Sequence, residues 1–237
     1  MSSYGKLYLL PVPISDSEKN DFIPEHNLLI VRSLVNFIAE DAKTARRFLK
    51  WFGYPKIEEA EILLLNEHTK ISSVSELLQP LFDGKDMGLM SDAGCPGIAD
   101  PGADVIKLAH QKNIQVIPLA GPSSIVLSIM ASGFNGQNFA FNGYLPIDKP
   151  LRLKRIKELE TLAVKYSQAQ FFIETPYRND QLFESLLSAL SLETLVFIGK
   201  DLTATNQFIS TKSVFDWKKA IKPEINKVPV VFGIYKA

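Results

Sequence analysis

Short apolar runs alternate along the first half of the chain with stretches in which apolar residues recur every three or four positions. The short runs predict buried strands, and the longer period predicts amphipathic helices. We expect strands at 7–10, 28–31, 37–39, 87–90 and 114–119. We expect helices at 42–52, 75–82, 100–111 and 125–131, the third of them capped by Asp100. This alternation is typical of a mainly parallel α/β sheet.

The second half of the chain repeats the alternation. We expect strands at 139–141, 171–174, 194–198 and 228–235, and helices at 151–166 and 179–190. Residues 206–214 are rich in Thr, Ile, Phe and Val and predict an antiparallel pair. We therefore expect two α/β domains, residues 1–119 and 120–237.

Length and composition narrow the class of protein. The 237 residues are 46% hydrophobic and 22% charged, as in a folded globular protein. A formal net charge of zero removes any whole-protein attraction to nucleic acid or membranes, although a local basic patch stays possible. The single cysteine, Cys95, excludes a disulfide framework and a cysteine-cluster metal site. With no leader and no span-length apolar stretch in view, we expect a cytoplasmic protein without a metal.

The most unusual segment is the connection at residues 91–102, Ser-Asp-Ala-Gly-Cys-Pro-Gly-Ile-Ala-Asp-Pro-Gly, directly after a predicted strand. Its glycines allow positive φ and close approach of a ligand to the backbone, while its prolines keep the loop stiff. Both properties favour a ligand-binding loop over a simple turn. No phosphate-binding glycine-lysine motif and no dinucleotide glycine pattern is present, which argues against nucleoside triphosphate and nicotinamide ligands.

Unusual residues follow three further predicted strands. In an open α/β sheet, ligands bind beyond the carboxyl ends of the strands. We therefore expect four loops to converge on one site, at residues 11–14, 92–97, 121–124 and 174–176.

These segments resemble the tetrapyrrole methylase superfamily of S-adenosylmethionine-dependent enzymes. Within it, they are most similar to the branch that methylates a cytidine ribose 2′-hydroxyl in 16S rRNA. Residues 91–102 match that branch's Ser-Asp-Ala-Gly-Thr-Pro-Gly-Ile-Ser-Asp-Pro-Gly, with departures at Cys95 and Ala99. Its short motifs match residues 120–123, 143–146 and 174–178.

The resemblance implies two α/β domains with S-adenosylmethionine in the cleft between them, in a homodimer. A sulfonium donor is positively charged, so carbonyl-lined backbone suits it better than a cationic pocket. Ser123 and Ser124 could instead cap the following helix, and Asp92 could only stabilise its turn. The implied cofactor contacts are Ile14, Asp92, Ala93, Gly94, Cys95, Ile98, Ser123, Ser124, Tyr144, Thr175 and Lys200.

The acceptor side of the motif matches less well. The family's Glu-Asp-Thr-Arg reads Glu-Asp-Ala-Lys at residues 40–43, and its Arg-Glu-Leu-Thr-Lys reads Lys-Asp-Leu-Thr-Ala at 200–204. A histidine-rich segment corresponds to Asn66, Glu67 and His68. Methylation of a hydroxyl requires a group that accepts its proton. The candidate catalytic carboxylates are Glu40, Asp41 and Asp201, and the candidate substrate-binding residues are Lys43, Arg46 and Arg178.

Two basic stretches, residues 43–50 and 149–157, could contact RNA phosphates, or could be ordinary solvated helix faces. The leading hypothesis is therefore methylation of a ribose 2′-hydroxyl in small-subunit rRNA, with the rRNA or the small ribosomal subunit as partner. Two alternatives remain open. The first is methylation of a tetrapyrrole or corrin precursor, and the second is an inactive paralogue that only binds S-adenosylmethionine.

Overall fold

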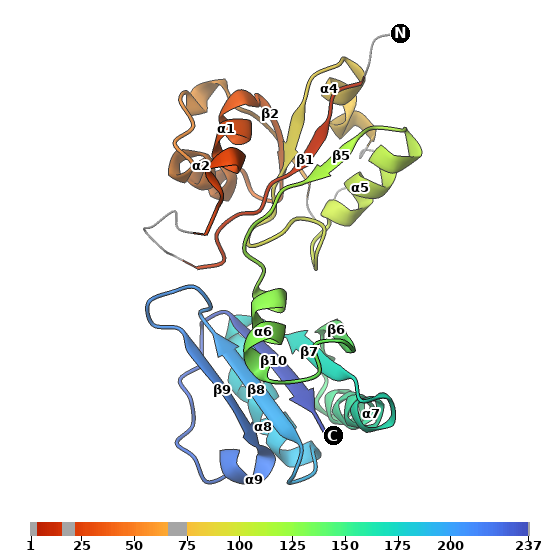
Figure 1. Cartoon of the computed structure of the whole chain (residues 1–237), viewed down its shortest axis with the longest axis vertical. Helices are drawn as coiled ribbons and strands as arrows, with labels where there is room; N and C mark the ends of the chain where they lie inside the picture. Colours follow the sequence, from red (N-terminus) through yellow and green to blue (C-terminus); the bar gives the residue numbers. More distant parts are fainter. Residues whose placement is uncertain (1–3, 16–21, 66–74, 237) are drawn as a thin grey trace. The chain divides into compact units, whose positions relative to one another are not determined.

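The computed structural model describes residues 4–15, 22–65 and 75–236 (Figure 1). The chain divides into two compact units, Met1–Ser123 and Ser124–Ala237. The division lies after Ser123, whereas the sequence pattern placed it after Leu119. The segment between these positions packs on unit 1, where the Asn27 side-chain amide donates to the Ala120 carbonyl at 2.7 Å.

Unit 1 contains a five-stranded sheet in which every neighbouring pair is parallel. The order across the sheet is β3-β2-β4-β1-β5. The strands are β1 (Leu7–Leu9), β2 (Asn36–Ala39), β3 (Glu61–Leu64), β4 (Met87–Leu89) and β5 (Val116–Pro118). Because all five run the same way, the loops that follow them leave from one edge.

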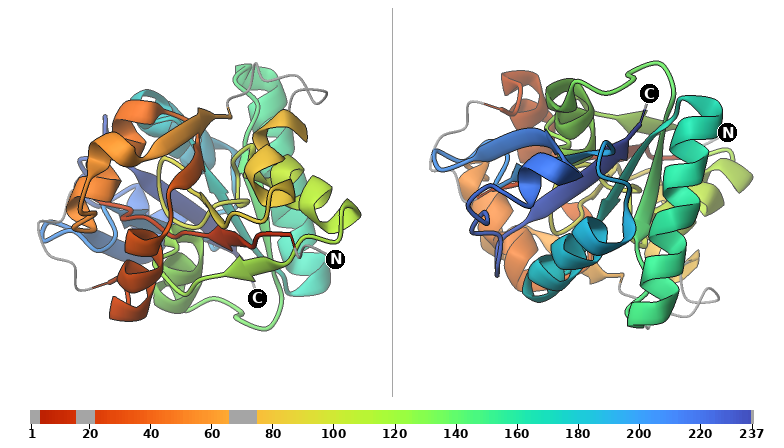
Figure 2. Two further views of the ribbon diagram at one scale, coloured as in Figure 1. Left: turned by 90° about the horizontal axis from the view of Figure 1, so that it is seen from above. Right: turned by 90° about the horizontal axis from the view of Figure 1, so that it is seen from below.

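Helices cover both faces of this sheet (Figure 2, left). On one face, α1 (Glu25–Ser33) and α2 (Ala42–Trp51) contribute to a buried cluster. On the other, α4 (Gln79–Phe82) and α5 (Gly102–Gln111) do the same. A short 3-10 helix, η1 (Ile57–Glu59), precedes β3. The doubly wound arrangement confirms the α/β expectation for this half of the chain.

The strand predicted at residues 28–31 is wrong, because these residues lie inside α1. Its run of apolar residues has a helical burial pattern: Leu28 and Val31 are buried, while Leu29 between them is 59% exposed. A four-residue apolar run does not distinguish a strand from one side of a helix. The edge strand β3 was not predicted. The helix expected at 75–82 is confirmed: residues 75–77 are helical, a turn at Leu78 follows, and α4 continues to Phe82.

Unit 2 contains a second five-stranded sheet, in the order β6-β7-β10-β8-β9. Only β6 and β7 pair in parallel, and the other three pairs are antiparallel. The expectation of a mainly parallel sheet is therefore wrong for this half, because periodicity does not report strand direction. The antiparallel pair predicted near 206–214 is confirmed by β9 against β8. The strands are β6 (Phe139–Tyr144), β7 (Ala169–Ile173), β8 (Leu195–Lys200), β9 (Phe208–Ser213) and β10 (Val230–Tyr235).

Two long helices, α7 (Lys149–Tyr166) and α8 (Asn179–Ala189), pack on one face of the unit 2 sheet (Figure 2, right). The same core includes Trp217 of α9 (Val214–Trp217). On the other face, α6 (Ser124–Ser132) packs beside a cluster of Phe134, Phe171 and Phe197. The 3-10 helix η2 (Pro176–Arg178) connects β7 to α8. No helix in the described ranges is long and apolar enough to cross a membrane.

Candidate functional site

The loops after β1 and β4 are joined by backbone hydrogen bonds at the carboxyl edge of the unit 1 sheet. Val12 N donates to Gly94 O at 2.9 Å, and Gly94 N donates to Val12 O at 3.2 Å. Gly94 has a φ of +72°, and a Cβ added there would lie 3.2 Å from Cγ2 of Ile14. Glycine therefore provides both the left-handed backbone and the space for Ile14.

The loop after β5 contacts the loops after β1 and β4. The Cys95 thiol donates to the Pro122 carbonyl at 3.4 Å. A Cβ on Gly121 would lie only 2.3 Å from Cβ of Pro11, so the two loops approach more closely than any other residue would allow. Three of the four predicted loops thus meet at one edge, which brings together Ile14, Asp92, Ala93, Gly94, Cys95 and Ser123.

Asp100 organises the second half of the 91–102 loop. Its carboxylate accepts hydrogen bonds from Gly97 N at 2.9 Å and from Gly102 N at 2.7 Å. The expectation that Asp100 is the cap residue is wrong by one position, because α5 begins at Gly102 and its capping position is Pro101. These bonds hold the turn that leaves Ile98 49% exposed.

Two carboxylates lie close together at this edge, the half-buried Glu40 and the exposed Asp92. Glu40 follows β2, and its Oε1 accepts from Asp92 N at 3.3 Å. Burial raises the pKa of Glu40, as do the charges of Asp92 and Asp100, although the hydrogen bond from Asp92 N lowers it. Burial also raises the pKa of Asp92, the charge of Asp41 adds to this, and Arg47 opposes it. The edge therefore carries negative charge that a cationic ligand would stabilise.

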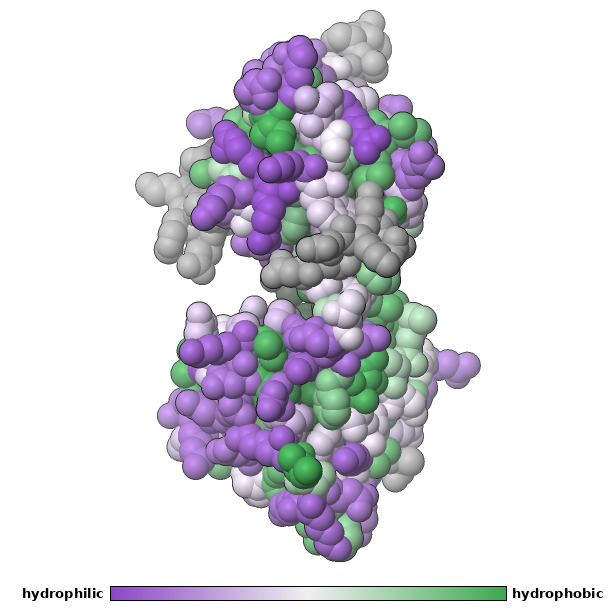
Figure 3. Space-filling model, turned by 90° about the vertical axis from the view of Figure 1, so that its left-hand side faces the viewer, coloured by the Kyte–Doolittle hydropathy of each residue, from purple (hydrophilic) through white to green (hydrophobic). Residues whose placement is uncertain are grey.

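Asp41 has a local structural role. Its carboxylate caps α2 by accepting from Thr44 N at 2.7 Å, and this hydrogen bond lowers the pKa of Asp41. A capping carboxylate with a lowered pKa is a weaker proton acceptor than Glu40. Lys43 and Arg46 lie on the same helix with exposed side chains. Figure 3 views the side of unit 1 that carries α1 and α2, and many residues there are hydrophilic.

In unit 2, the predicted contacts from β6, β7 and β8 lie along one row across the sheet. Tyr144 pairs with Ile173, Val231 of β10 pairs with Ile173, and Lys200 pairs with Val230. Thr175 follows β7 by two residues. The carboxyl ends of these three strands therefore share an edge, and it brings Tyr144, Thr175 and Lys200 together within unit 2.

Glu174 and Arg178 form an ion pair at this edge. Oε1 of Glu174 accepts from Nη2 of Arg178 at 2.7 Å, from Nε at 3.0 Å and from Thr175 N at 2.7 Å. The Glu174 side chain is 1% exposed and that of Arg178 is 27% exposed. The guanidinium proposed to contact substrate thus has two of its nitrogens committed to Glu174.

The remaining candidates have simple local surroundings. Asp201 has a φ of +46°, and its Oδ2 accepts from Asn206 Nδ2 at 3.4 Å. Ser124 is the first residue of α6 and Ser123 precedes it, a position that agrees with the capping alternative. Asn66, Glu67 and His68 lie outside the described residues. Within the described residues, no group of three His, Cys, Asp or Glu side chains could hold a metal ion.

Comparison with known proteins finds a solved structure with a similar fold and several proteins with similar sequences. A crystal structure of the methyltransferase CobJ is similar over 98% of this chain and 95% of its own, with a TM-score of 0.65 and 14% identity. No protein-family model matches the chain. "Ribosomal RNA small subunit methyltransferase I" of Escherichia coli O157:H7 is 26% identical over 226 residues, which are 95% of this chain and 75% of the relative. The protein of the same name from Thermotoga maritima is 30% identical over 86% of each chain.

The fold and the relatives define a methyltransferase of the tetrapyrrole methylase class. Within that class, the chain belongs to the ribosomal RNA small subunit methyltransferase I family. Both the α/β fold and the family expected from residues 91–102 are thereby confirmed.

Proposed function

We propose that this protein transfers a methyl group from S-adenosylmethionine to a ribose 2′-hydroxyl of small-subunit rRNA. The observation that carries the proposal is the edge of unit 1, where three loops meet around Gly94. The names of the relatives support the rRNA acceptor.

The residues at this edge suit S-adenosylmethionine. Its sulfonium and ammonium groups are cationic, and Glu40 and Asp92 supply negative charge beside exposed backbone. The half-buried Ile14 and the exposed Ile98 offer apolar surface for a nucleoside. Gly94 is itself buried against Ile14, and the exposed residues beside it, Asp92 and Ala93, present the loop to a ligand. When bound, the donor supplies an electrophilic methyl carbon.

Glu40 is the better placed of the unit 1 carboxylates to accept the hydroxyl proton. Its raised pKa brings it nearer to neutral pH, which improves a general base, whereas Asp41 is occupied as a helix cap. General base catalysis contributes roughly 10²–10⁴-fold, and positioning of the two substrates contributes much of the rest. Asp201 in unit 2 stays a second candidate for this role.

Lys43 and Arg46, exposed on α2 directly after Glu40, are proposed to contact RNA phosphates. Contacts of this kind depend on salt, because each neutralised phosphate releases counterions. Arg178 contributes less to this surface in our proposal, because its guanidinium is paired with Glu174. The homodimer and the cytoplasmic location implied by the resemblance stay predictions.

Transfer of a labelled methyl group tests the acceptor. The protein is incubated with methyl-labelled S-adenosylmethionine and, in separate reactions, small ribosomal subunits, naked rRNA and tetrapyrrole precursors. We expect label in RNA, in a dinucleotide that resists alkali because its 2′-hydroxyl is blocked. Label in a tetrapyrrole would replace the rRNA proposal with the tetrapyrrole alternative. Donor binding without transfer to any acceptor would favour the inactive paralogue.

Substitution of Asp92 tests the donor site. We expect Asp92→Asn to weaken S-adenosylmethionine binding by about 1–3 kcal/mol, the usual cost of losing a charged partner. Because the pKa of Asp92 is raised, its charge is lost sooner than that of an ordinary aspartate as the pH falls. Calorimetric titration of the wild type at about pH 7 and about pH 5 should therefore show weaker binding at the lower pH. Asp92→Asn should reduce this difference without abolishing it, because the pKa of Glu40 is raised as well.

The same raised pKa has the opposite effect on folding. The folded protein holds the Asp92 proton more tightly than the unfolded chain does. Its contribution to stability is thus present below the ordinary pKa of about 4 and is lost as the pH rises through the folded value.

The matched control for the binding measurement is Asp104→Asn, at an exposed position in the first turn of α5. Equal donor affinity in wild type and Asp92→Asn would remove Asp92 from the site.

A further inference from the structure

The strand β6 contains an irregularity just before the candidate contact Tyr144. Phe141 pairs with Phe171, and the next pair is Tyr144 with Ile173. One extra residue of β6 is therefore accommodated at Asn142 and Gly143, which is a β-bulge. Gly143 has a φ of +61°, and a Cβ there would meet nothing within 4 Å, so its backbone conformation, and not lack of space, favours glycine.

The bulge changes which face of the sheet Tyr144 occupies. In a regular strand, residues two apart share a face, so Asn142 and Tyr144 would lie on the same side. Here Tyr144 is paired with Ile173, which packs on the Phe171 cluster. Its neighbour Leu145 belongs to the core beneath α7 and α8 on the opposite face. Tyr144 is thereby directed away from α7, with 56% of its surface exposed.

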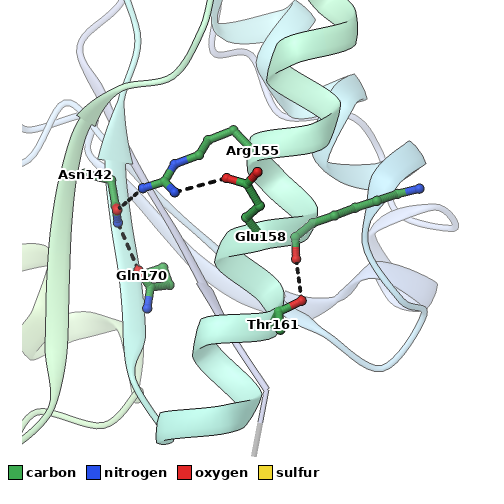
Figure 4. Close-up of polar contacts among 6 residues, drawn as sticks. Asn142, Arg155, Glu158, Thr161 and Gln170 are labelled. Atoms are coloured by element: carbon green, nitrogen blue, oxygen red, sulfur yellow. Dashed lines mark hydrogen bonds and ion pairs between the residues drawn. The ribbon is translucent and has the colours of Figure 1, made fainter.

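The Asn142 side chain connects the bulge to its surroundings (Figure 4). Its Nδ2 donates to Oε1 of Gln170 at 3.0 Å and to the Phe171 carbonyl at 3.3 Å. Its Oδ1 accepts from Nη2 of Arg155 at 3.2 Å. Gln170 is fully buried, which makes its side chain a fixed anchor. The amide thus bonds to β7 at the bulge and to helix α7 at once.

Arg155 is itself oriented by α7. Its Nη1 donates to Oε2 of Glu158, one turn along the helix, at 3.3 Å. Gln170 donates in turn to Oε1 of Gln168 at 2.9 Å. The buried amide of Gln170 accepts from Asn142 and donates to Gln168, so it has little freedom to rotate.

We propose that Asn142 is a positioning residue for donor binding: held by Arg155 and Gln170, it fixes the bulge that directs Tyr144 away from α7. This inference rests on the proposed function, to which it adds the prediction that Tyr144 contacts S-adenosylmethionine. Asn142 acts through Tyr144 and does not itself touch the donor. The bulge determines the direction of the Tyr144 side chain, because without the extra residue Tyr144 would face α7.

A double-mutant cycle on donor affinity tests this inference. The dissociation constant of S-adenosylmethionine is measured by calorimetry for wild type, Asn142→Ala, Tyr144→Ala and the double variant. We expect Asn142→Ala to weaken binding about tenfold, the upper effect of one hydrogen-bonding side chain. We expect almost no further loss when Asn142→Ala is added to Tyr144→Ala, because the residue through which it acts is already absent.

A second variant and a control guard against misfolding. Arg155→Met keeps the aliphatic stem of a half-buried side chain and removes one partner of Asn142, and we expect about a threefold loss of affinity. Thr161→Ala removes a bond to the Lys157 carbonyl on the same helix and should leave affinity unchanged. The thermal unfolding temperature of each variant shows how much stability the substitution costs.

The outcomes separate this inference from the proposed function. A wild-type protein that does not bind S-adenosylmethionine would overturn both. If the wild type binds and Asn142→Ala and Arg155→Met bind as tightly, only the positioning role of Asn142 is overturned. The same holds if the loss is equal with and without Tyr144, because Asn142 would then affect donor binding independently of Tyr144.

Discussion

Arg178→Ala is expected to lower the free energy of unfolding by about 2–4 kcal/mol, the largest effect among the substitutions proposed. The Glu174 side chain is 1% exposed, and removing Arg178 leaves its charge buried without a cationic partner. Breaking a fully buried pair costs about 3–5 kcal/mol, and the partial exposure of Arg178 reduces this. Denaturant unfolding followed by circular dichroism measures the change.

A double variant tests whether the unpaired charge of Glu174 causes the loss of stability. Glu174→Gln added to Arg178→Ala removes the uncompensated charge while keeping an acceptor for Thr175 N, so the double variant should recover much of the lost stability. The control is Lys222→Ala, which breaks exposed ion pairs to Asp180 and Glu184 and should cost less than about 1 kcal/mol. A double variant less stable than Arg178→Ala would mean that the loss came from packing.

Gly121→Ala is expected to lower the free energy of unfolding by about 1–3 kcal/mol and to weaken S-adenosylmethionine binding together with it. The added Cβ would lie 2.3 Å from Cβ and 2.7 Å from Cγ of Pro11, and a proline ring cannot rotate away. The loops after β1 and β5 must therefore separate. Chemical denaturation and calorimetric titration of the same preparation give both values.

Gly136 offers a matched control in a loop of unit 2. A Cβ there would meet nothing within 4 Å, and its φ is not in the left-handed range. Gly136→Ala should therefore leave donor binding unchanged and raise stability slightly, by about 0.4–1 kcal/mol, because alanine restricts the unfolded chain. Unchanged affinity in Gly121→Ala would show that the contact with Pro11 does not shape the donor site.

Most of what the sequence predicted about the site came from the motif at residues 91–102. The glycines of residues 91–102 were expected to allow positive φ. Gly94 and Gly97 have φ of +72° and +85°, whereas Gly102 begins the helix α5. These predictions succeeded because a left-handed backbone position selects glycine locally, whatever the rest of the fold does. The capping role of Asp41, a candidate catalytic residue in the sequence, was not predicted, nor was the hydrogen bond from Gly102 N to Asp100.

Elements whose character depends on their neighbours were predicted less well. Residues 28–31 form part of a helix because Leu28 and Val31 share one buried side, which becomes evident only when the opposing core is present. The strand β10 lies between β7 and β8 and runs antiparallel to both, and no local pattern reports such long-range pairing. The half-buried edge strand β3 lacks the strong alternation that would have marked it.

The sequence by itself determined that the chain alternates strands and helices, that residues 91–102 form a stiff, glycine-rich loop, and which family the chain resembles. Those properties depend on residue type and short spacing. Only the tertiary structure decided that Gly121 lies against Pro11, that Arg178 pairs with the buried Glu174, and that a bulge held by Asn142 sets the side of Tyr144. Each is a contact or register between elements, and its energy depends on burial and direction that arise when the sheets assemble.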